Sequence, residues 1–231
     1  MRIIAHRSGP TVFPEQTIAS ARCALENGAD FVEIDVRFTS DKAIAICHDP
    51  NAKRVFGVDK QICDMTKCEY LALRHADAPE YPSHLFEDYL KCGIAPLLIH
   101  IKEDQVIPQL LEQIMQYGYL DKVVLGVGTL DAVHISREIA PEVKILSFMP
   151  KPELIEAFAD AGVDYIRLWE GWMNPETVKQ VKATGKELWI MTRAEGDYDA
   201  GVTTAEGLKK ILSYDVDGIL INDINELKAI L

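Results

Sequence analysis

The sequence predicts an α/β protein, a (β/α)8 TIM barrel with a small insertion after the second strand. Eight short apolar runs rich in isoleucine, valine and leucine recur along the chain, and helix-length amphipathic stretches separate them. Parallel strands covered by helices give this pattern, and eight such units close a barrel. The chain has 231 residues, 48% of them hydrophobic, which is enough for one large core. We therefore expect a single domain over residues 1–231.

Each apolar run is expected to form one barrel strand. A glycine placed to end the preceding helix announces three of them, at Gly28, Gly162 and Gly185. Two segments depart from the alternation of strands and helices: an extra short strand at 43–48, and the stretch from about 49 to 95. We interpret the second as the insertion and as a candidate lid. The expected barrel strands are Arg2-His6, Phe31-Val36, Leu97-Lys102, Lys122-Val127, Lys144-Phe148, Tyr165-Leu168, Glu187-Thr192 and Gly218-Ile221.

Charge and composition argue against several classes of partner. The chain has 24 basic and 36 acidic residues, a net charge of -12, which opposes non-specific binding to nucleic acid or to an anionic membrane surface. Its five cysteines are scattered without a CxxC pair, which suits a reducing compartment. No apolar run is long enough for a signal-peptide core or a membrane span. We expect a cytoplasmic protein without stable membrane insertion, and a homo-oligomer remains open.

Polar residues at the carboxyl ends of the strands carry most weight, because barrel active sites lie there. In the second strand a period of two places Glu33, Asp35 and Arg37 on one face. Two inward-pointing carboxylates repel each other unless a cation binds between them or one is protonated. A hard divalent metal ion is the simplest solution. The alternative is ion pairing with Arg37 and another basic side chain.

Two histidines are expected at the same mouth. His6 ends the first strand and His48 ends the extra strand, so both imidazoles could reach the carboxylates. Beside a metal ion, such a pair suits acid/base chemistry. Taken singly, each would more often be a hydrogen-bonded structural residue.

The third strand adds a third candidate ligand and a cation. His100 and Lys102 share a face, expected to be the inward one. His100 could complete a ligand set with Glu33 and Asp35, and Lys102 could hold a phosphoryl oxygen as charge develops. For Lys102 the alternative is a structural salt bridge to Glu33.

The end of the sixth strand offers side chains for the rest of a substrate. Arg167 and Trp169 close this strand, and Trp172 follows in the next loop. They could line a pocket for an alcohol or a second anionic group. Surface packing is the competing interpretation.

At these residues the chain resembles the glycerophosphodiester phosphodiesterase family. The family's opening motif, His-Arg-Gly, a short loop and Pro-Glu-Asn-Thr, corresponds to residues 6–17 here. Its Gly-Ala-Asp, Glu-x-Asp-Val, Thr-x-Asp and His-Asp elements follow in order at residues 28–30, 33–36, 39–41 and 48–49. Weaker landmarks continue through the insertion at Arg54, residues 64–66 and residues 82–90. Beyond Lys102 the similarity is mainly architectural.

The resemblance implies a metal-dependent phosphodiesterase that hydrolyses glycerophosphodiesters to an alcohol and glycerol phosphate. Glu33 and Asp35 would hold the metal ion, His6 and His48 would be the general acid and base, and Arg7 with Lys102 would bind phosphate. In the family a neighbouring substrate hydroxyl attacks phosphorus, and the cyclic phosphate that forms is then hydrolysed. These assignments agree with the interpretation drawn from the residues.

Four positions depart from the family pattern: Ser8 replaces glycine, Gln16 replaces asparagine, Met191 lies near the usual tryptophan of strand seven, and His100 lies where a third carboxylate ligand is usual. The change at His100 matters most, because imidazole makes the ligand set less negative and softer. We expect one divalent ion, and a preference moved from Mg²⁺ or Ca²⁺ toward Mn²⁺, Zn²⁺ or a similar ion. Glu103 could also be recruited as a ligand.

Two rival functions fit the same residues. One is a lyase that stops at the cyclic phosphate because the hydrolytic half-reaction is weak. The other is a degenerate barrel that binds metal or phosphate without turnover. The departures from the family pattern at Ser8 and His100 suggest this alternative. The retention of two proton-transfer groups, His6 and His48, argues against the second, because a pure binder has no need of them. The preferred alcohol is not predicted.

Overall fold

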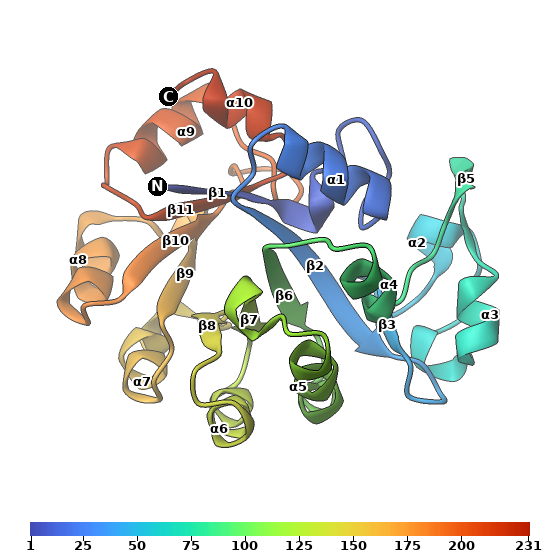
Figure 1. Cartoon of the computed structure of the whole chain (residues 1–231). Helices are drawn as coiled ribbons and strands as arrows, with labels where there is room; N and C mark the ends of the chain where they lie inside the picture. Colours follow the sequence, from blue (N-terminus) through green and yellow to red (C-terminus); the bar gives the residue numbers. More distant parts are fainter.

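Eight parallel strands close on themselves in the computed structural model, which describes residues 1–231 (Figure 1). Closure comes from β1, which pairs with β11 on one side and with β2 on the other. The predicted TIM barrel is therefore confirmed. The barrel strands are β1 (Arg2–Ala5), β2 (Phe31–Phe38), β6 (Leu97–Ile101), β7 (Val123–Val127), β8 (Lys144–Ser147), β9 (Tyr165–Trp169), β10 (Glu187–Met191) and β11 (Gly218–Ile221).

The strand ends differ from the predicted ones by at most two residues, and two of these differences matter for the site. His6 lies just outside β1, in a single 3-10 turn (His6–Ser8), and Lys102 lies just beyond β6. Both side chains therefore leave from the first loop residue at the carboxyl end of the barrel, where polar groups can be exposed to a substrate.

Helices cover the outside of the barrel, and their starts have a local cause in the sequence. Side chains of Thr17, Thr129, Asn174, Thr204 and Asp223 accept hydrogen bonds from free backbone N–H groups at five of these starts. The predicted helix-ending glycines all have positive φ, between 71° and 94°. The barrel helices are α1 (Ile18–Glu26), α4 (Phe86–Lys91), α5 (Ile107–Gln116), α6 (Leu130–Ile139), α7 (Ile155–Asp160), α8 (Pro175–Ala183), α9 (Ala205–Leu212) and α10 (Ile224–Lys228).

Two apolar layers hold this architecture together. A cluster of 49 buried residues lies between the strands and the surrounding helices. A second cluster of seven buried residues, which includes Trp189, Met191 and Leu220, fills the barrel interior. The inward-facing side chains therefore form a packed floor, and the polar groups lie above it at the carboxyl ends of the strands.

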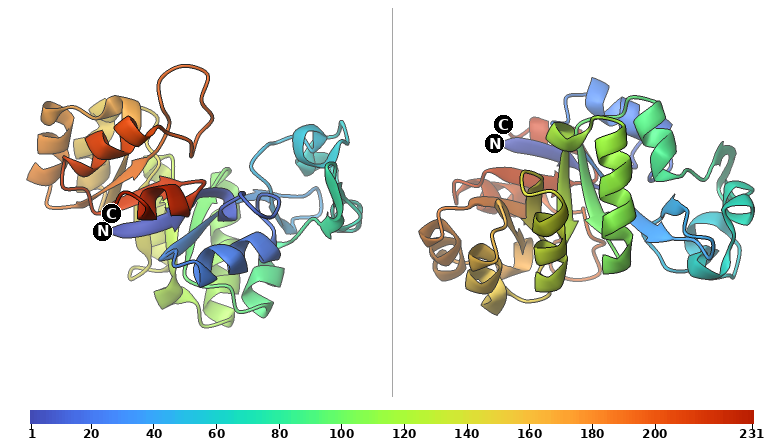
Figure 2. Two further views of the ribbon diagram at one scale, coloured as in Figure 1. Left: turned by 90° about the horizontal axis from the view of Figure 1, so that it is seen from above. Right: turned by 60° about the horizontal axis from the view of Figure 1, so that its bottom comes forward.

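The segment after β2 forms a small subassembly beside the barrel (Figures 1 and 2). The predicted extra strand is present as β3 (Ile44–Ile46), antiparallel to β2. Beyond it lie α2 (Lys53–Phe56), α3 (Lys67–Leu71) and the hairpin β4 (Arg74–His75) with β5 (Ala78–Pro82). Nine buried residues form a separate core here. Helix α4, at the end of the predicted insertion, instead packs on the main core through Phe86, Tyr89 and Leu90.

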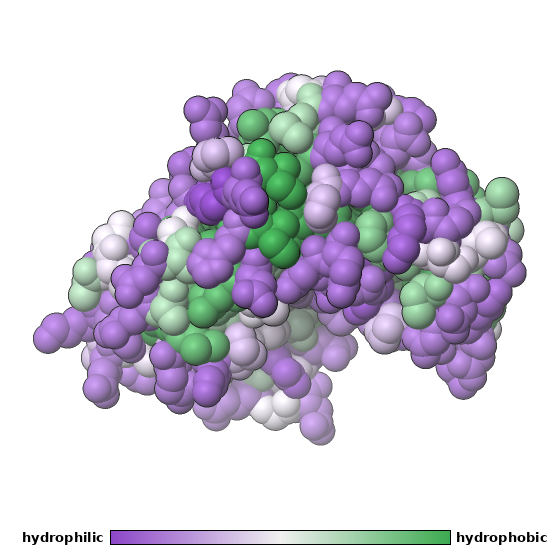
Figure 3. Space-filling model, turned by 90° about the horizontal axis from the view of Figure 1, so that it is seen from below, coloured by the Kyte–Doolittle hydropathy of each residue, from purple (hydrophilic) through white to green (hydrophobic).

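The surface agrees with the acidic, polar composition. Hydrophilic residues dominate the face in Figure 3, and a smaller apolar area lies near its centre. Large exposed hydrophobic side chains, such as Val12, Met115 and Leu231, are few and come from separate parts of the sequence. None of the helices has the length and apolarity needed to cross a membrane.

Candidate active site

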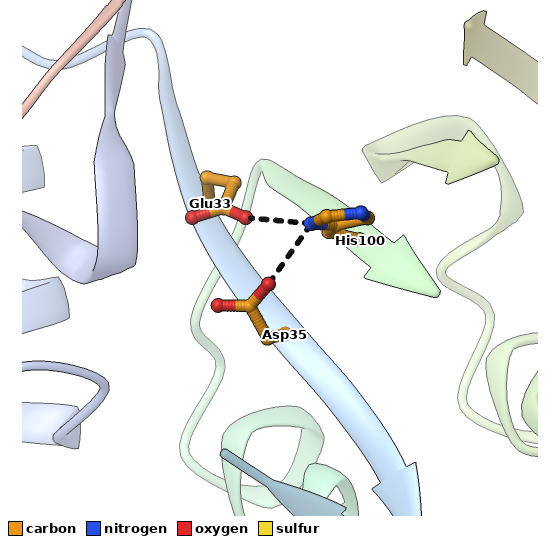
Figure 4. Close-up of side chains that lie close together, drawn as sticks. All are labelled: Glu33, Asp35 and His100. Carbon is orange, nitrogen blue, oxygen red and sulfur yellow. Dashed lines mark ion pairs between the residues drawn. The ribbon is translucent and has the colours of Figure 1, made fainter. Parts of the chain in front are cut away.

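Two buried carboxylates in the middle of β2 and an imidazole near the carboxyl end of β6 meet at one place (Figure 4). Parallel pairing places Asp35 directly beside His100. The Nδ1 atom of His100 lies 2.9 Å from Asp35 Oδ1 and 3.9 Å from Glu33 Oε1. One donor atom from each of the three residues lies within 4.8 Å of the others. The predicted ligand set is therefore brought together in a geometry that a single metal ion could bridge.

The two carboxylates do not ionise independently. Burial, followed by the charge of Asp35, raises the pKa of Glu33 to about 8. Burial also opposes ionisation of Asp35, but Lys102 and His100 outweigh it and hold the pKa of Asp35 well below its usual range. When no cation lies between the two carboxylates, burial and the charge of Asp35 therefore favour the protonated form of Glu33. A divalent ion would favour the charged form of both, which is the behaviour expected of a metal site.

Lys102 lies against the same carboxylate. Its Nζ atom is 2.8 Å from Asp35 Oδ1 and 3.0 Å from His100 Nδ1. The alternative pairing of Lys102 with Glu33 is not observed. Arg37 also takes no part in neutralising the carboxylates, because it binds Glu103 and the backbone oxygen of His48 instead. Glu103 is therefore held by Arg37, away from the proposed ligand set.

Gln16 orients Asp35, a role that was not predicted. Its Nε2 donates to Asp35 Oδ2 at 2.6 Å, and its Oε1 accepts from the Asp35 backbone N–H at 3.0 Å. The other carboxylate oxygen, Oδ1, is buried and faces His100 Nδ1 at 2.9 Å and Lys102 Nζ at 2.8 Å. Glu33 is held similarly by the backbone N–H of Arg7, at 2.7 Å from Oε2. Each carboxylate thus has one oxygen anchored by the protein and one directed at the shared site.

His6 is fixed by the last barrel strand. Its Nδ1 donates to Asn222 Oδ1 at 2.6 Å, just after β11, which leaves Nε2 as the basic nitrogen. Gly201 packs against this pair so closely that a Cβ there would lie 2.1 Å from Asn222 Oδ1 and 2.5 Å from His6 Nδ1. Asn222 was missed by the sequence analysis, although a polar residue directly after the eighth apolar run was a usable signal.

His48 is oriented by a carboxylate. Its Nδ1 donates to Asp49 Oδ1 at 2.7 Å, and Arg54 of the insertion binds the other oxygen of Asp49. Arg54 also makes a bidentate contact with Glu15, at 2.8 Å to each oxygen. This network ties the insertion to the loop after β1. Burial is the largest cause of the lowered pKa of His6, and the charge of His48 has a smaller effect in the same direction.

The burial of His6 makes stability depend on pH. Burial, followed by the charge of Arg7, lowers the pKa of His6 to about 3, whereas the unfolded chain titrates near 6.5. The unfolded state therefore binds a proton between these values and the folded state does not, so the free energy of unfolding falls as the pH falls through this window. Between pH 7 and pH 4.5 the free energy of unfolding of the native protein should fall by about 2–3 kcal/mol more than that of the variant His6→Gln. Urea unfolding of both proteins at the two pH values measures this, and equal losses would contradict it.

Arg7 has a partly buried side chain beside the site. Its Nη1 lies 3.4 Å from Glu15 Oε2, and its Nε is buried without a hydrogen-bond partner. The backbone of Arg7 and of Ser8 has positive φ, 47° and 67°, a region that glycine occupies more easily. The serine at the family's glycine position thus keeps the left-handed turn, at some cost in strain.

Arg167 and Trp169 lie on β9, and one aromatic side chain, Phe148, separates Arg167 from the candidate ligand His100. The Phe148 ring stacks on His100 with centroids 4.0 Å apart, and the Arg167 guanidinium lies 4.8 Å from the Phe148 centroid. Arg167 is only 2% exposed, so the alternative of surface packing is wrong for this residue. Met191, which replaces the usual tryptophan, is buried in the barrel interior.

Comparison with known proteins agrees with the fold and the motifs. Residues 6–123 match the model of the glycerophosphoryl diester phosphodiesterase family. A glycerophosphodiester phosphodiesterase of Caldanaerobacter subterraneus subsp. tengcongensis is 26% identical over 237 residues, which cover 96% of this chain and 93% of the relative. The human glycerophosphodiester phosphodiesterase 1 is 43% identical over 63 residues only, 27% of this chain and 19% of the relative.

Solved structures show the same architecture. A phosphodiesterase of Oleispira antarctica, solved with the product sn-glycerol-3-phosphate, superposes with a TM-score of 0.86 at 18% identity and covers all of this chain and 96% of that one. A glycerophosphodiester phosphodiesterase of Agrobacterium tumefaciens gives a TM-score of 0.81 at 21% identity over 99% of both chains.

Fold and site together define a TIM-barrel phosphodiesterase. The chain belongs to the glycerophosphoryl diester phosphodiesterase family, and the enzyme class predicted from its motifs, glycerophosphodiester phosphodiesterase, is thereby confirmed.

Proposed function

We propose that this chain hydrolyses glycerophosphodiesters with one divalent metal ion and the histidine pair His6 and His48. The observation that carries the proposal is the convergence of Glu33, Asp35 and His100 at the mouth of the barrel. Lys102 lies against Asp35, and the charge of Asp35 acts on the pKa of both His6 and His48, which supports a common site.

The donor set fits a metal ion. Glu33 and Asp35 each keep an oxygen directed at the shared site, where Asp35 Oδ1 lies 2.8 Å from Lys102 Nζ and 2.9 Å from His100 Nδ1. One imidazole nitrogen cannot both donate to Asp35 and accept from Lys102, so the contacts of His100 Nδ1 are not all satisfied within the protein. Bound there, a divalent ion would withdraw charge from a phosphoryl oxygen as a Lewis acid.

The histidines supply the proton transfers. His6 and His48 both have Nδ1 engaged, by Asn222 and Asp49, so Nε2 is the atom available to the substrate. One histidine takes the proton of the substrate hydroxyl that attacks phosphorus, and the other protonates the departing alcohol. In the second half-reaction the roles reverse, because the histidine that gained a proton can return it while its partner activates water. Arg7 and Lys102 hold the phosphoryl oxygens.

Product analysis tests this function. The purified protein with added metal ion is incubated with glycerophosphodiesters, and the products are followed by phosphorus NMR. We expect glycerol phosphate as the final product, with the cyclic phosphate at most transient. Accumulation of the cyclic phosphate would identify a lyase instead, and absence of turnover with every substrate and ion would identify a binding protein.

The imidazole ligand should set the metal preference. With His100 in the set we expect Mn²⁺ or Zn²⁺ to support higher activity than Mg²⁺ or Ca²⁺. His100→Glu restores a third carboxylate and should shift the preference toward the harder ions, by roughly tenfold in relative activity, the size of change seen when the surroundings of a metal are altered. Activity measured across the four ions in both proteins decides this. The same ion order in both would show that His100 does not bind the metal.

A further inference from the structure

Arg167 is a buried positive charge without a counter-ion. Its side chain points into the barrel from β9 and is 2% exposed. No ion pair in the structure includes it, and neither Nε nor Nη1 has a hydrogen-bond partner. The one hydrogen bond that its side chain makes, from Nη2 to the Met149 carbonyl, is long at 3.4 Å. Burial alone lowers the pKa of Arg167 to about 9, so the group remains charged at neutral pH.

Aromatic rings take the place of acidic partners. The guanidinium carbon lies 4.6 Å from the Trp169 ring, 4.8 Å from Phe148 and 5.8 Å from Trp172. Cation–π contacts position a guanidinium but do not saturate its N–H donors, which point in the plane of the group. Buried donors without partners are costly to maintain, so a group in this state is commonly completed by a ligand.

The two tryptophans that contact Arg167 line a pocket that is open to solvent, whereas Arg167 itself lies behind them and is not part of the pocket lining. A pocket of about 390 Å³ is lined by the same two tryptophans and by residues 193–196 of the loop after β10, including Arg193 and Glu195. The Phe148 ring that contacts Arg167 also stacks on the proposed metal ligand His100. Gly126 makes room for this ring, since a Cβ there would lie 2.6 Å from Phe148 Cε2. Arg167 therefore lies between the proposed metal ligand His100, which it reaches across Phe148, and the tryptophans that line the pocket.

We infer that Arg167, with Trp169 and Trp172, forms a subsite for an acidic headgroup, a phosphate monoester or a carboxylate on the alcohol arm of the diester. The planar fork of arginine suits both groups. The aromatic faces that could hold a quaternary ammonium are already taken by the guanidinium, and its charge repels cationic headgroups. This inference rests on the proposed function and adds the class of substrate.

Three matched glycerophosphodiesters test it: one with a glycerol headgroup, one with a glycerol phosphate headgroup and one with a glycerate headgroup. Glycerophosphocholine serves as the cationic comparison. The native protein should prefer both acidic substrates to the neutral one by roughly 10- to 100-fold in kcat/KM, the equivalent of a charged hydrogen bond. Glycerophosphocholine should have the lowest kcat/KM of the four substrates. The kcat/KM values of the two acidic substrates show whether the subsite binds a phosphate or a carboxylate better.

The variant Arg167→Met should lose the preference for acidic headgroups, whatever happens to its absolute rate. If Arg167→Met does not fold, Arg167→Gln, which also removes the charge, is used in the same test. Arg22→Met removes an exposed arginine from α1 and controls for net charge; its preference should equal that of the native protein. A purely structural Arg167 would lower the Tm on replacement without changing the preference, whereas removal of an uncompensated charge should raise the Tm.

The outcomes separate the two proposals. Turnover of diesters without any preference for acidic headgroups, or a preference that survives in Arg167→Met, would overturn the subsite and leave the hydrolase intact. Failure to turn over any diester would overturn the proposed function itself.

Discussion

His48→Gln and His6→Gln should each lower kcat/KM for glycerophosphodiesters by roughly 10²–10⁴-fold. Either change removes one of the two proton-transfer groups while keeping a side chain of similar size that can hydrogen bond. Without its histidine, the reaction must form a free alkoxide at one step, which the remaining groups do not prevent. The measurement is a steady-state assay with saturating metal ion, made with Tm values to confirm folding.

The double variant and a surface histidine provide the controls. Because both histidines act in the same turnover, the double variant should lose little more than the worse single one. His134→Gln changes an exposed histidine on α6 and should retain native activity. If either single variant keeps more than about a tenth of native kcat/KM, that histidine is not a general acid or base, given the size of such effects.

Asp35→Asn should abolish metal-dependent activity. Asp35 Oδ1 lies 2.9 Å from His100 Nδ1 and 2.8 Å from Lys102 Nζ, so a neutral amide removes the charge on which both contacts depend. Loss of a group that only supports a metal ligand lowers metal affinity or activity by about 10–100-fold. Loss of a ligand itself should therefore lower activity by at least about 100-fold. Activity of the native protein should disappear in strong chelator and return when the ion is added back. The variant should remain inactive at every ion concentration that restores the native protein.

Asp160→Asn is the matched control. It removes an exposed carboxylate at the end of α7 and should respond to chelation and re-addition as the native protein does. Native activity that persists in strong chelator would show that the carboxylate pair has a structural role.

The barrel was predictable because its signals are local. Each strand is a short apolar run, and a buried parallel strand needs little else, so all eight were identified with ends within two residues. Glu33, Asp35, His100 and Lys102 were predictable for the same reason: the period of two along β2 and β6 fixes which side chains face inward. The prediction of His6 and His48 depended in addition on the order of the family motifs along the sequence.

Residues that act on the site from distant parts of the chain were not predictable in the same way. Asn222 meets His6 across 216 positions of sequence, and only barrel closure between β1 and β11 brings them together. Gln16 was noted as a departure from a motif, but its two hydrogen bonds to Asp35 depend on the conformation of a loop with positive φ at Gln16. The link from Arg167 through Phe148 to His100 joins β9, the residue after β8, and β6, and it leaves no pattern within any one of these segments.

Anomalous diffraction from crystals soaked in Mn²⁺ tests the central claim most directly. The account predicts one strong peak at the mouth of the barrel, about 2.0–2.3 Å from Glu33, Asp35 and His100, the range of first-row metal ligands. Displacement of Lys102 from the Asp35 oxygen should accompany it. A peak elsewhere, or none in crystals of a catalytically active preparation, would contradict the account, because the proposed chemistry depends on an ion held between these side chains.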